Sequence, residues 1–547
     1  VELRVREPHG WQPWQTVGVR ADAPDAGSPD EQHSAGRWGT DPVITSGSSI
    51  GVQARVWTAD GVRPAALDLV LIDGRATAAD AQAVGAAVGG LAATAAYAAS
   101  TQPSIVSRAD WGADESLRTG EPRYAATVKM AFVHHTVTSS TYSRAQGPAQ
   151  VRAVYAYDTL GLGISDLGYN FMVDRYGTIY EGRAGGIERA VVGAHTAGFN
   201  KESFAVAVLG DLHNVRPGTA ELARIVNAVG TVAGWKLGLF HRDPMAPVSL
   251  TSDGKYGTSR YDAGEVATMP YSLVGHGDIG QTACPGKYLR TQLGLIRDVA
   301  RKYQGTMIWT PAAAAVAWPW RPAPATAQSG TAVTATVSES MALTMTVTSA
   351  CASEPVRTIG PLNVPGGDVT VRWDGFDDAG QPVPPGRYFI EVSGVADSGA
   401  VPMPAVVAVD IDAAVGAPRG PCDQVWRYAP SSSVAEAVLE ANADIASTST
   451  AVIAGSDSAD LPEAVVAAVL SRRLKAVFAL VPPSGLSARV VDHLKTRGIT
   501  RALIVARNGR LPGLPGALSN AGITDVTSIA GDSPASVSLA AMTRGWP

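Results

Sequence analysis

Two stretches of biased composition divide this 547-residue chain and constrain its fold more than any other feature. Residues 76–104 are rich in Ala and Gly, and residues 306–330 are rich in Pro and Ala. Such compositions do not favour a packed core, and Pro-rich segments tend to stay extended. Since domains average about 150 residues, a chain of this length is expected to form several. We therefore expect linkers at both stretches and separate domains around them.

The first 75 residues show the two-residue alternation that is typical of half-buried strands. Val1, Leu3 and Val5 alternate with charged residues, and the period recurs at residues 52–56 and 67–71. We expect an N-terminal β-domain over residues 1–75, most simply a β-sandwich. Its tryptophans fit either an aromatic sugar-binding face or ordinary core packing. They are Trp11, Trp14, Trp38 and Trp57.

Residues 105–305 mix strand and helix patterns. Apolar residues at helical spacing predict helices over residues 222–232 and 289–300. Short apolar runs predict strands at residues 128–133, 171–173, 178–180 and 204–209. Strands that alternate with helices predict a central α/β domain, in which helices flank a mixed β-sheet.

Two further domains are expected after the second linker. Residues 331–422 return to strand alternation, and their turn-rich part, residues 373–392, reads WDGFDDAGQPVPPGRYFIEV. This part resembles the immunoglobulin-like domain of flagellar hook-cap proteins, which implies a β spacer. Residues 423–547 alternate helix and strand patterns again, which predicts a C-terminal α/β domain. Its strands are expected at residues 451–453, 476–480 and 502–505.

Charge and hydropathy exclude some classes of partner. The formal net charge is -5, so the chain lacks the basic excess that binds nucleic acid through its phosphates. A run of 18 strongly apolar residues is missing, so we expect no transmembrane segment. The sequence begins at Val1 without a charged and apolar leader, as it would after removal of a secretory signal, and this favours export.

Three side chains suited to zinc are spread along the central domain. His134 stands beside His135 at the end of a predicted strand, whereas His276 and Cys284 lie in the sequence GHGDIGQTACPG. Imidazole and thiolate suit Zn²⁺, and three protein ligands leave the fourth position open, as in catalytic sites. Taken one by one, the same residues are more typical of buried strand-end histidines and a buried thiol.

Five motifs in order make residues 108–304 resemble the zinc amidases shared by peptidoglycan recognition proteins and phage endolysins. They are RADWGA, FVHHT, GYNFMVDRYGTIYEGR, GAHTAGFN and HGDIGQTACPG. The resemblance implies a Zn²⁺ ion held by His134, His276 and Cys284. Since side chains alternate along a strand, His135 is expected to point away from that ion.

The same resemblance implies roles for other residues. Tyr169 matches the catalytic tyrosine, whose hydroxyl would donate to the oxyanion or position the attacking water. Thr282 stands where the phage enzymes carry an essential lysine, so it joins the catalytic candidates while the proton donor to the leaving amine stays unassigned. His195 and Asn200 are candidates for lining the substrate groove, with stabilisation of their own loop as the alternative.

The activity implied is that of an N-acetylmuramoyl-L-alanine amidase. Such an enzyme hydrolyses the amide between the lactyl group of N-acetylmuramic acid and L-alanine in peptidoglycan, for wall remodelling or lysis. Two alternatives are a peptidoglycan-binding protein without hydrolase activity and a surface structural protein. The complete zinc set favours the enzyme.

The C-terminal domain resembles the cell wall binding repeat 2 family over residues 486–505 and 518–541. The matching sequences are LSARVVDHLKTRGITRALIV and LSNAGITDVTSIAGDSPASVSLAA. This resemblance implies attachment to anionic wall polymers, hence a secreted, wall-associated protein. Cys351 and Cys422 bracket the spacer domain and are a candidate disulfide of an exported protein, the alternative being two buried thiols.

Overall fold

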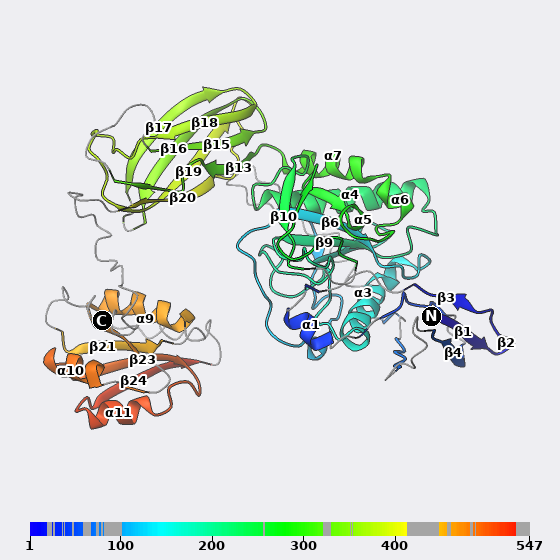
Figure 1. Ribbon diagram of the computed structural model, residues 1–547, viewed down its shortest axis with the longest axis horizontal. Helices are drawn as coiled ribbons and strands as arrows, with labels where there is room; N and C mark the ends of the chain where they lie inside the picture. Colours follow the sequence, from blue (N-terminus) through cyan, green and yellow to red (C-terminus); the bar gives the residue numbers. More distant parts are fainter. Residues whose placement is uncertain are drawn as a thin grey trace. The chain divides into compact units, whose positions relative to one another are not determined.

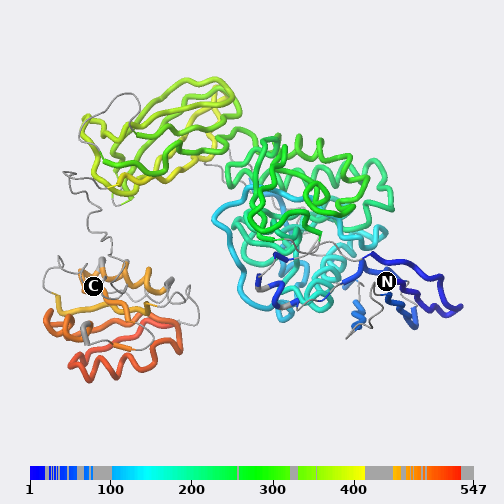
Figure 2. The backbone as a smooth tube through the Cα atoms, in the orientation of Figure 1, coloured from blue at the N-terminus to red at the C-terminus, as the bar shows by residue number. Residues whose placement is uncertain are grey.

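The computed structural model divides the chain into two compact units (Figure 1). The first comprises Val1–Ser349, Ser353–Val383 and Arg387–Ala414, and the second comprises Ala350–Ala352, Pro384–Gly386 and Val415–Pro547. The residues described are 1–18, 24–25, 28–34, 37, 39–45, 49–57, 67–72, 76–77, 80, 101–254, 258–320, 330–350, 352, 354–412, 448–456, 461–481, 485–486 and 488–531. The order of the elements along the chain can be followed in Figure 2.

The N-terminal region contains one small antiparallel sheet. Strand β1 (Glu2–Glu7) pairs with β2 (Gly10–Trp11), β3 (Gln15–Thr16) and β4 (Gly51–Arg55). The described residues show no second sheet packed on it, so the β-sandwich is unconfirmed. The strand expected at residues 67–71 is wrong: this segment forms no strand, and Leu67, Leu69 and Leu71 are exposed. Alternation of apolar residues predicts a strand only where a partner strand and a core are available to it.

A six-stranded mixed sheet forms the centre of the central domain, residues 105–305, and confirms the strands expected there. Its order is β12-β6-β9-β7-β8-β5, and only the β7–β8 pair is antiparallel. The strands are β5 (Ile105–Val106), β6 (Met130–His135), β7 (Phe171–Val173), β8 (Ile179–Glu181), β9 (Ser203–Val208) and β12 (Leu273–Gly275). The three central strands are buried along their whole length, as expected for a sheet covered on both faces.

Helices cover both faces of this sheet (Figure 1). On one face, α4 (Thr219–Gly238) and α7 (Leu293–Gln304) pack on alternate residues of β6 and β9, including Val133 and Phe204. On the other face, α3 (Gly147–Ala156) packs with Trp111 and Tyr169, and a π-helical turn (Tyr157–Gly161) extends it. A hairpin of β10 (Val248–Thr251) and β11 (Val266–Met269) lies beside β6 and β12. Short helical turns complete the domain: η1 (Glu115–Leu117), η2 (Arg144–Gln146), α5 (His276–Ile279) and α6 (Lys287–Arg290).

The immunoglobulin-like domain consists of two sheets, in which the pairs β13–β15, β15–β18, β16–β17 and β16–β19 are antiparallel and the pair β14–β20 is parallel. One sheet has the order β13-β15-β18 and the other β14-β20-β19-β16-β17. Their strands are β13 (Ile308–Ala313), β14 (Ala317–Pro319), β15 (Thr331–Val337), β16 (Met341–Ser349), β17 (Pro355–Val364), β18 (Gly367–Trp373), β19 (Gly386–Ala396) and β20 (Ala405–Asp412).

The linker expected over residues 306–330 is wrong in its first half, because β13 pairs with β15 and β14 pairs with β20. Both are edge strands, and the register of β13 shifts between Trp309 and Ala312, around Pro311. Proline lacks a backbone N–H, so edges and irregular positions are where a sheet accepts it. The Pro and Ala content therefore fits an edge strand as well as a linker.

The second unit contains a parallel sheet in the order β22-β21-β23-β24. Its strands are β21 (Thr450–Gly455), β22 (Val477–Val481), β23 (Arg501–Arg507) and β24 (Asp525–Gly531), with helices α9 (Leu461–Leu474), α10 (Ala488–Thr496) and α11 (Leu514–Asn520). The three strands predicted here are confirmed. Cys351 and Cys422 lie outside the described residues. None of the helices described in either unit is long and apolar enough to cross a bilayer.

Candidate metal centre

The register of two parallel strands brings the two histidines together. Strand β12 runs parallel to β6, with Gly275 opposite Val133. A histidine follows each of these two residues: His276, at the start of α5, follows Gly275, and His134, near the end of β6, follows Val133. Because parallel strands end at the same edge of a sheet, the two side chains emerge side by side. Their ring centroids are 4.6 Å apart.

Cys284 joins this pair from the loop that follows α5. The loop folds back because the Gly277 N–H donates to the Cys284 carbonyl at 2.8 Å, and the Cys284 N–H donates to Thr282 Oγ1 at 3.1 Å. A Cβ on Gly277 would meet the carbonyl oxygens of Thr282 and Cys284 at 2.6 and 2.8 Å, so this close approach requires glycine. The fold thus places the thiol beside the histidines, and Thr282 holds the loop in shape.

The three side chains fit a metal ion. Their ligand atoms lie within 4.8 Å of one another, and all three residues are buried. Cys284 Sγ lies 3.6 Å from His134 Nδ1, close to the separation of about 3.5 Å that tetrahedral zinc bonds of 2.0–2.3 Å produce. A His, His and Cys set matches the ligand types that zinc prefers. Among the described residues, no other group of three or more His, Cys, Asp or Glu side chains is arranged so that it could hold a metal ion.

The neighbours of His134 assign its two ring nitrogens different roles. Nδ1 faces the Cys284 sulfur, whereas Nε2 lies 3.3 Å from Thr196 Oγ1. With Nδ1 directed at a metal, the proton of the neutral ring resides on Nε2 and is donated to the Thr196 hydroxyl. Thr196 was not among the predicted site residues. Its signal in the sequence is its place next to His195 in GAHTAGFN.

Tyr169 and His195 flank His134 and are both fully buried. The centroid of each ring lies 5.3 Å from that of His134. Tyr169 comes just before β7, and His195 lies in the loop of residues 193–200. Thr196 Oγ1 connects the rings further, because it also lies 3.0 Å from His195 Nδ1. The structure therefore brings together the three predicted ligands, Tyr169 and His195.

Asn200 and His135 do not face this centre. Asn200 Oδ1 accepts from the backbone N–H groups of His195 and Thr196 at 2.6 and 2.9 Å, so it shapes the loop that carries them. His135 Nδ1 accepts from the Leu212 N–H at 3.1 Å. The geometry thus agrees with loop stabilisation for Asn200.

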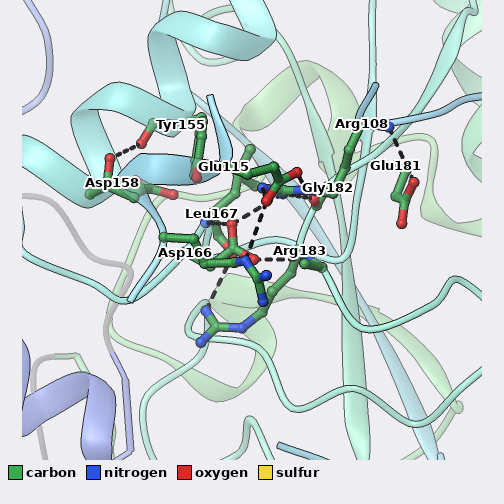
Figure 3. Close-up of polar contacts among 12 residues, drawn as sticks. Arg108, Glu115, Tyr155, Asp158, Asp166, Leu167, Glu181, Gly182 and Arg183 are labelled. Atoms are coloured by element: carbon green, nitrogen blue, oxygen red, sulfur yellow. Dashed lines mark hydrogen bonds and ion pairs between the residues drawn. The ribbon is translucent and has the colours of Figure 1, made fainter. Parts of the chain in front are cut away.

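An ion-pair network around the buried side chains of Arg108 and Asp166 holds the segment that leads into Tyr169 (Figure 3). Arg108 donates to Glu115 Oε1 at 2.8 Å, to Asp166 Oδ1 at 3.1 Å and to the Gly182 carbonyl at 2.5 Å. Asp166 in turn accepts from the Ala184 N–H at 2.8 Å. The motif RADWGA therefore contributes Arg108 as a brace that fixes the chain before Tyr169 against β8.

An aspartate from the N-terminal region also reaches the loop of residues 193–200. Asp25 Oδ1 accepts from Asn200 Nδ2 at 2.8 Å and from the Asn200 N–H at 3.3 Å. Asp25 is 5% exposed. Burial raises its pKa to about 6, against the opposing effect of the Asn200 hydrogen bonds. No local sequence pattern marks this contact, which joins residues far apart in the chain.

The raised pKa of Asp25 predicts a pH-dependent stability. Between pH 4 and 6 the folded chain keeps a proton that the unfolded chain has lost, so the free energy of unfolding falls as pH rises through this window, by up to about 3 kcal/mol. Denaturant unfolding at pH 4.5 and 7.5 measures about two thirds of this difference. Asp25→Asn cannot ionise at this position and should reduce the difference in unfolding free energy between the two pH values. Asp253→Asn should keep most of the difference, because the charge of Asp253 raises the pKa of Asp25 less than burial does. An equal pH dependence in Asp25→Asn and the unmodified chain would contradict the assignment.

Comparisons with known proteins agree with this geometry. Residues 124–287 match the family described as N-acetylmuramoyl-L-alanine amidase, and residues 323–398 match the FlgD Ig-like domain, which confirms the hook-cap resemblance. Peptidoglycan-recognition protein SC2 of Drosophila simulans is 31% identical over 183 residues, which cover 34% of this chain and 80% of the relative. Its Drosophila melanogaster counterpart is 30% identical over the same shares.

Solved structures of similar proteins also match. Human PGRP-IβC in complex with a glycosamyl muramyl pentapeptide is 25% identical, covering 35% of this chain and 96% of that chain with a TM-score of 0.27. Drosophila PGRP-LB is 22% identical, covering 35% and 92%, also with a TM-score of 0.27. The likeness of residues 423–547 to cell wall binding repeats stays a prediction.

Proposed function

Because this chain belongs to the family of peptidoglycan recognition proteins and N-acetylmuramoyl-L-alanine amidases, we propose that it is a zinc-dependent amidase that cleaves peptidoglycan. The bond cleaved is the amide between the lactyl group of N-acetylmuramic acid and L-alanine. The observation that carries this proposal is the cluster of His134, His276 and Cys284 with Tyr169 beside it. A protein that only binds peptidoglycan has no need of a complete set of ligands for a catalytic metal.

The residues of the site divide the chemistry among them. Zn²⁺ held by the three ligands would supply a Lewis acid and a water whose pKa is lowered to about 7. His134 is oriented by Thr196, which keeps the Nδ1 lone pair directed at the ligand cluster. The Tyr169 hydroxyl is proposed to donate to the oxyanion that develops on the attacked carbonyl. Thr282 acts on the loop of Cys284, which leaves the proton donor to the leaving amine unassigned.

One assay tests the proposal. Purified peptidoglycan is incubated with the full chain, and newly released amino termini are labelled and identified, with and without a zinc chelator. We expect N-terminal L-alanine to accumulate, to stop with chelator and to resume when Zn²⁺ is restored. Binding to peptidoglycan without new amino termini would instead establish a recognition protein, and neither binding nor release would favour a surface structural protein.

The remaining modules are proposed to place the enzyme at the wall after export. The immunoglobulin-like domain would serve as a spacer, and residues 423–547 would attach to anionic wall polymers. Such attachment raises the local concentration of an insoluble substrate around the site. This advantage disappears when the substrate is free in solution.

Removing the C-terminal residues 426–547 is therefore expected to affect retention but not chemistry. Hydrolysis of a soluble muropeptide should stay within about twofold, because this segment belongs to a separate compact unit. Sedimentation with purified walls should fall. Equal sedimentation of the truncated and full chains would refute the anchor, and lost hydrolysis of the soluble substrate would refute the independence of the two units.

A further inference from the structure

A row of alternating arginine and tryptophan side chains lies on one face of the N-terminal sheet, whose strands β1 to β4 are labelled in Figure 1. The guanidinium carbon of Arg55 lies 3.8 Å from the centroid of the Trp14 ring, and that of Arg4 lies 4.5 Å from the same ring. On its other side, Arg4 lies 4.9 Å from the Trp11 ring, and Arg6 lies 5.9 Å from that ring. We call these five side chains, in the order Arg55, Trp14, Arg4, Trp11 and Arg6, the Arg–Trp row.

The two-residue period of the strands explains why these side chains share a face. In β1, Arg4 and Arg6 alternate with Val5, so the arginines point to one face of the sheet and Val5 points to the other. Strand pairing places Trp11 of β2 opposite Arg6. Val5 is buried, whereas Arg6 is exposed and Trp11 is 38% exposed. The Arg–Trp row therefore lies on the exposed face of the sheet, and Trp11 is not a core residue.

The row carries an excess of positive charge on a chain whose formal net charge is -5. Within the described ranges, the carboxylate that pairs with its three arginines is that of Glu2, whose Oε2 lies 3.8 Å from Arg55 Nη1. Arg4 Nε donates to Gln53 Oε1 at 2.7 Å, and this partner is neutral. Two of the three positive charges are thus left without a carboxylate partner among the described residues, so the face is complementary to an anion.

Stacking on tryptophan prepares these arginines to bind anionic groups. A guanidinium that lies over an aromatic ring keeps its N–H donors at its edge, where they match the paired oxygens of a carboxylate or a phosphate. The stacked side chain is also partly immobilised before binding, so it loses less conformational freedom when the anion arrives.

The rest of the face favours a sugar polymer over a membrane. The residues of β1 and β4 that share the face with the arginines are Glu2, Gly51 and Gln53, so these two strands add no aliphatic side chain that could enter a bilayer. Tryptophan combines a large apolar ring with a polar N–H, which suits a partner that is apolar on one side and wet on the other. Sugar rings have this character, because their C–H faces are apolar and their hydroxyl groups are hydrated.

We propose that the Arg–Trp row binds an anionic polysaccharide, in which the sugars carry carboxylate or phosphate groups. The edges of the arginines bind the anionic groups, and the exposed parts of the tryptophan rings contact the sugars. This role goes beyond the proposed amidase function and does not rest on it, because the row lies on a different sheet from the three candidate metal ligands.

Binding of the full chain to labelled oligosaccharides tests the proposal. Oligogalacturonate supplies carboxylates, its methyl ester supplies the same sugars without charge, and a phosphorylated oligomannose supplies phosphates. Fluorescence anisotropy is measured with a chelator present, so that hydrolysis plays no part. We expect at least one of the two anionic glycans to bind tenfold or more tighter than the methyl ester, and the tighter of the two identifies the anionic group. Equal binding of all three would overturn the proposal, and so would equal binding of polyglutamate or preferential binding of anionic lipid vesicles.

A pair of charge-matched variants locates the site. Arg4→Gln with Arg6→Gln removes two charges from the row, whereas Arg144→Gln with Lys302→Gln removes two exposed charges elsewhere. Arg144 is a suitable control because it also stacks on an aromatic ring, that of Tyr176, at 4.9 Å. The row variant should bind the anionic glycan about tenfold more weakly and with a shallower dependence on salt concentration, because fewer anionic groups are neutralised. The control should keep the affinity of the unmodified chain. Equal affinity in the two variants would refute the site.

Trp11→Leu tests the sugar contact separately from the charge. It removes the ring between Arg4 and Arg6 and keeps all three positive charges of the row. We expect severalfold weaker binding of the anionic glycan with an unchanged dependence on salt concentration. Unchanged affinity would show that the tryptophan makes no contact with the glycan, and would overturn a polysaccharide as the partner.

A cross-linking measurement on the unmodified chain does not depend on the folding of any variant. The tighter anionic glycan, carrying a photoreactive diazirine, is irradiated with the full chain, and the cross-linked peptides are mapped by mass spectrometry. We expect cross-links within residues 1–16 and 51–57. Cross-links confined to the central domain or to residues 423–547 would assign the binding to another part of the chain and refute the proposal.

Discussion

Cys284→Ala is expected to yield a folded protein that retains no stoichiometric zinc and has lost amidase turnover on the order of 10⁴-fold or more. The thiol faces His134 Nδ1 at 3.6 Å and supplies one of only three ligands. Two histidines alone make too few bonds to retain a catalytic ion. The several kcal/mol of charge stabilisation that the ion provides would be lost with it.

Zinc content by elemental analysis and release of amino termini measure the two effects together. His276→Ala should behave in the same way as Cys284→Ala. The matched control is His135→Asn, next to His134, because its carbonyl oxygen can accept from the Leu212 N–H in place of His135 Nδ1. This control should keep both zinc and activity. Full zinc occupancy in Cys284→Ala and His276→Ala would refute the ligand set.

Tyr169→Phe should lower turnover on the order of 10²-fold or more and leave zinc content unchanged, as loss of one oxyanion donor does in other enzymes. The ring packs beside His134 with a centroid distance of 5.3 Å and is fully buried. Phenylalanine keeps this packing and removes only the hydroxyl, so the fold should be preserved.

The distribution of the effect between kcat and KM tests the role of the hydroxyl. An interaction made only in the transition state lowers kcat and kcat/KM equally. Tyr155→Phe is a suitable control, because its hydroxyl donates to the Asp114 carbonyl on the same face of the sheet without contacting the metal ligands. Turnover unchanged in Tyr169→Phe would assign Tyr169 to the core alone.

The sequence predicted the composition of the centre better than its geometry. His134, His276 and Cys284 were identified by ordered motifs, but their proximity depends on the parallel register of β12 and β6, which no local pattern specifies. Thr196 was missed for the same reason. It meets His134 only because the loop of residues 193–200 is folded around Asn200.

The N-terminal region illustrates a second limit. Asp25 and Asp30 bond to residues more than a hundred positions away, in a region whose apolar alternation predicted only strands. A buried aspartate has no periodic signature, since its partner rather than its position makes it stable. Composition cannot separate a linker from an edge strand, because both accept proline. Pro311 and Pro319 lie in the edge strands β13 and β14, within the stretch that was expected to be a linker.

The position of β12 ties durability to metal supply. This edge strand is three residues long and pairs with β6 alone in the sheet, and His276 follows it directly. An ion bound by His134, His276 and Cys284 would therefore link this edge strand to the centre of the sheet, in addition to serving the reaction. Loss of the metal would then destabilise the folded protein as well as abolish its activity. The unfolding temperature of the protein would consequently rise with the concentration of free zinc around it.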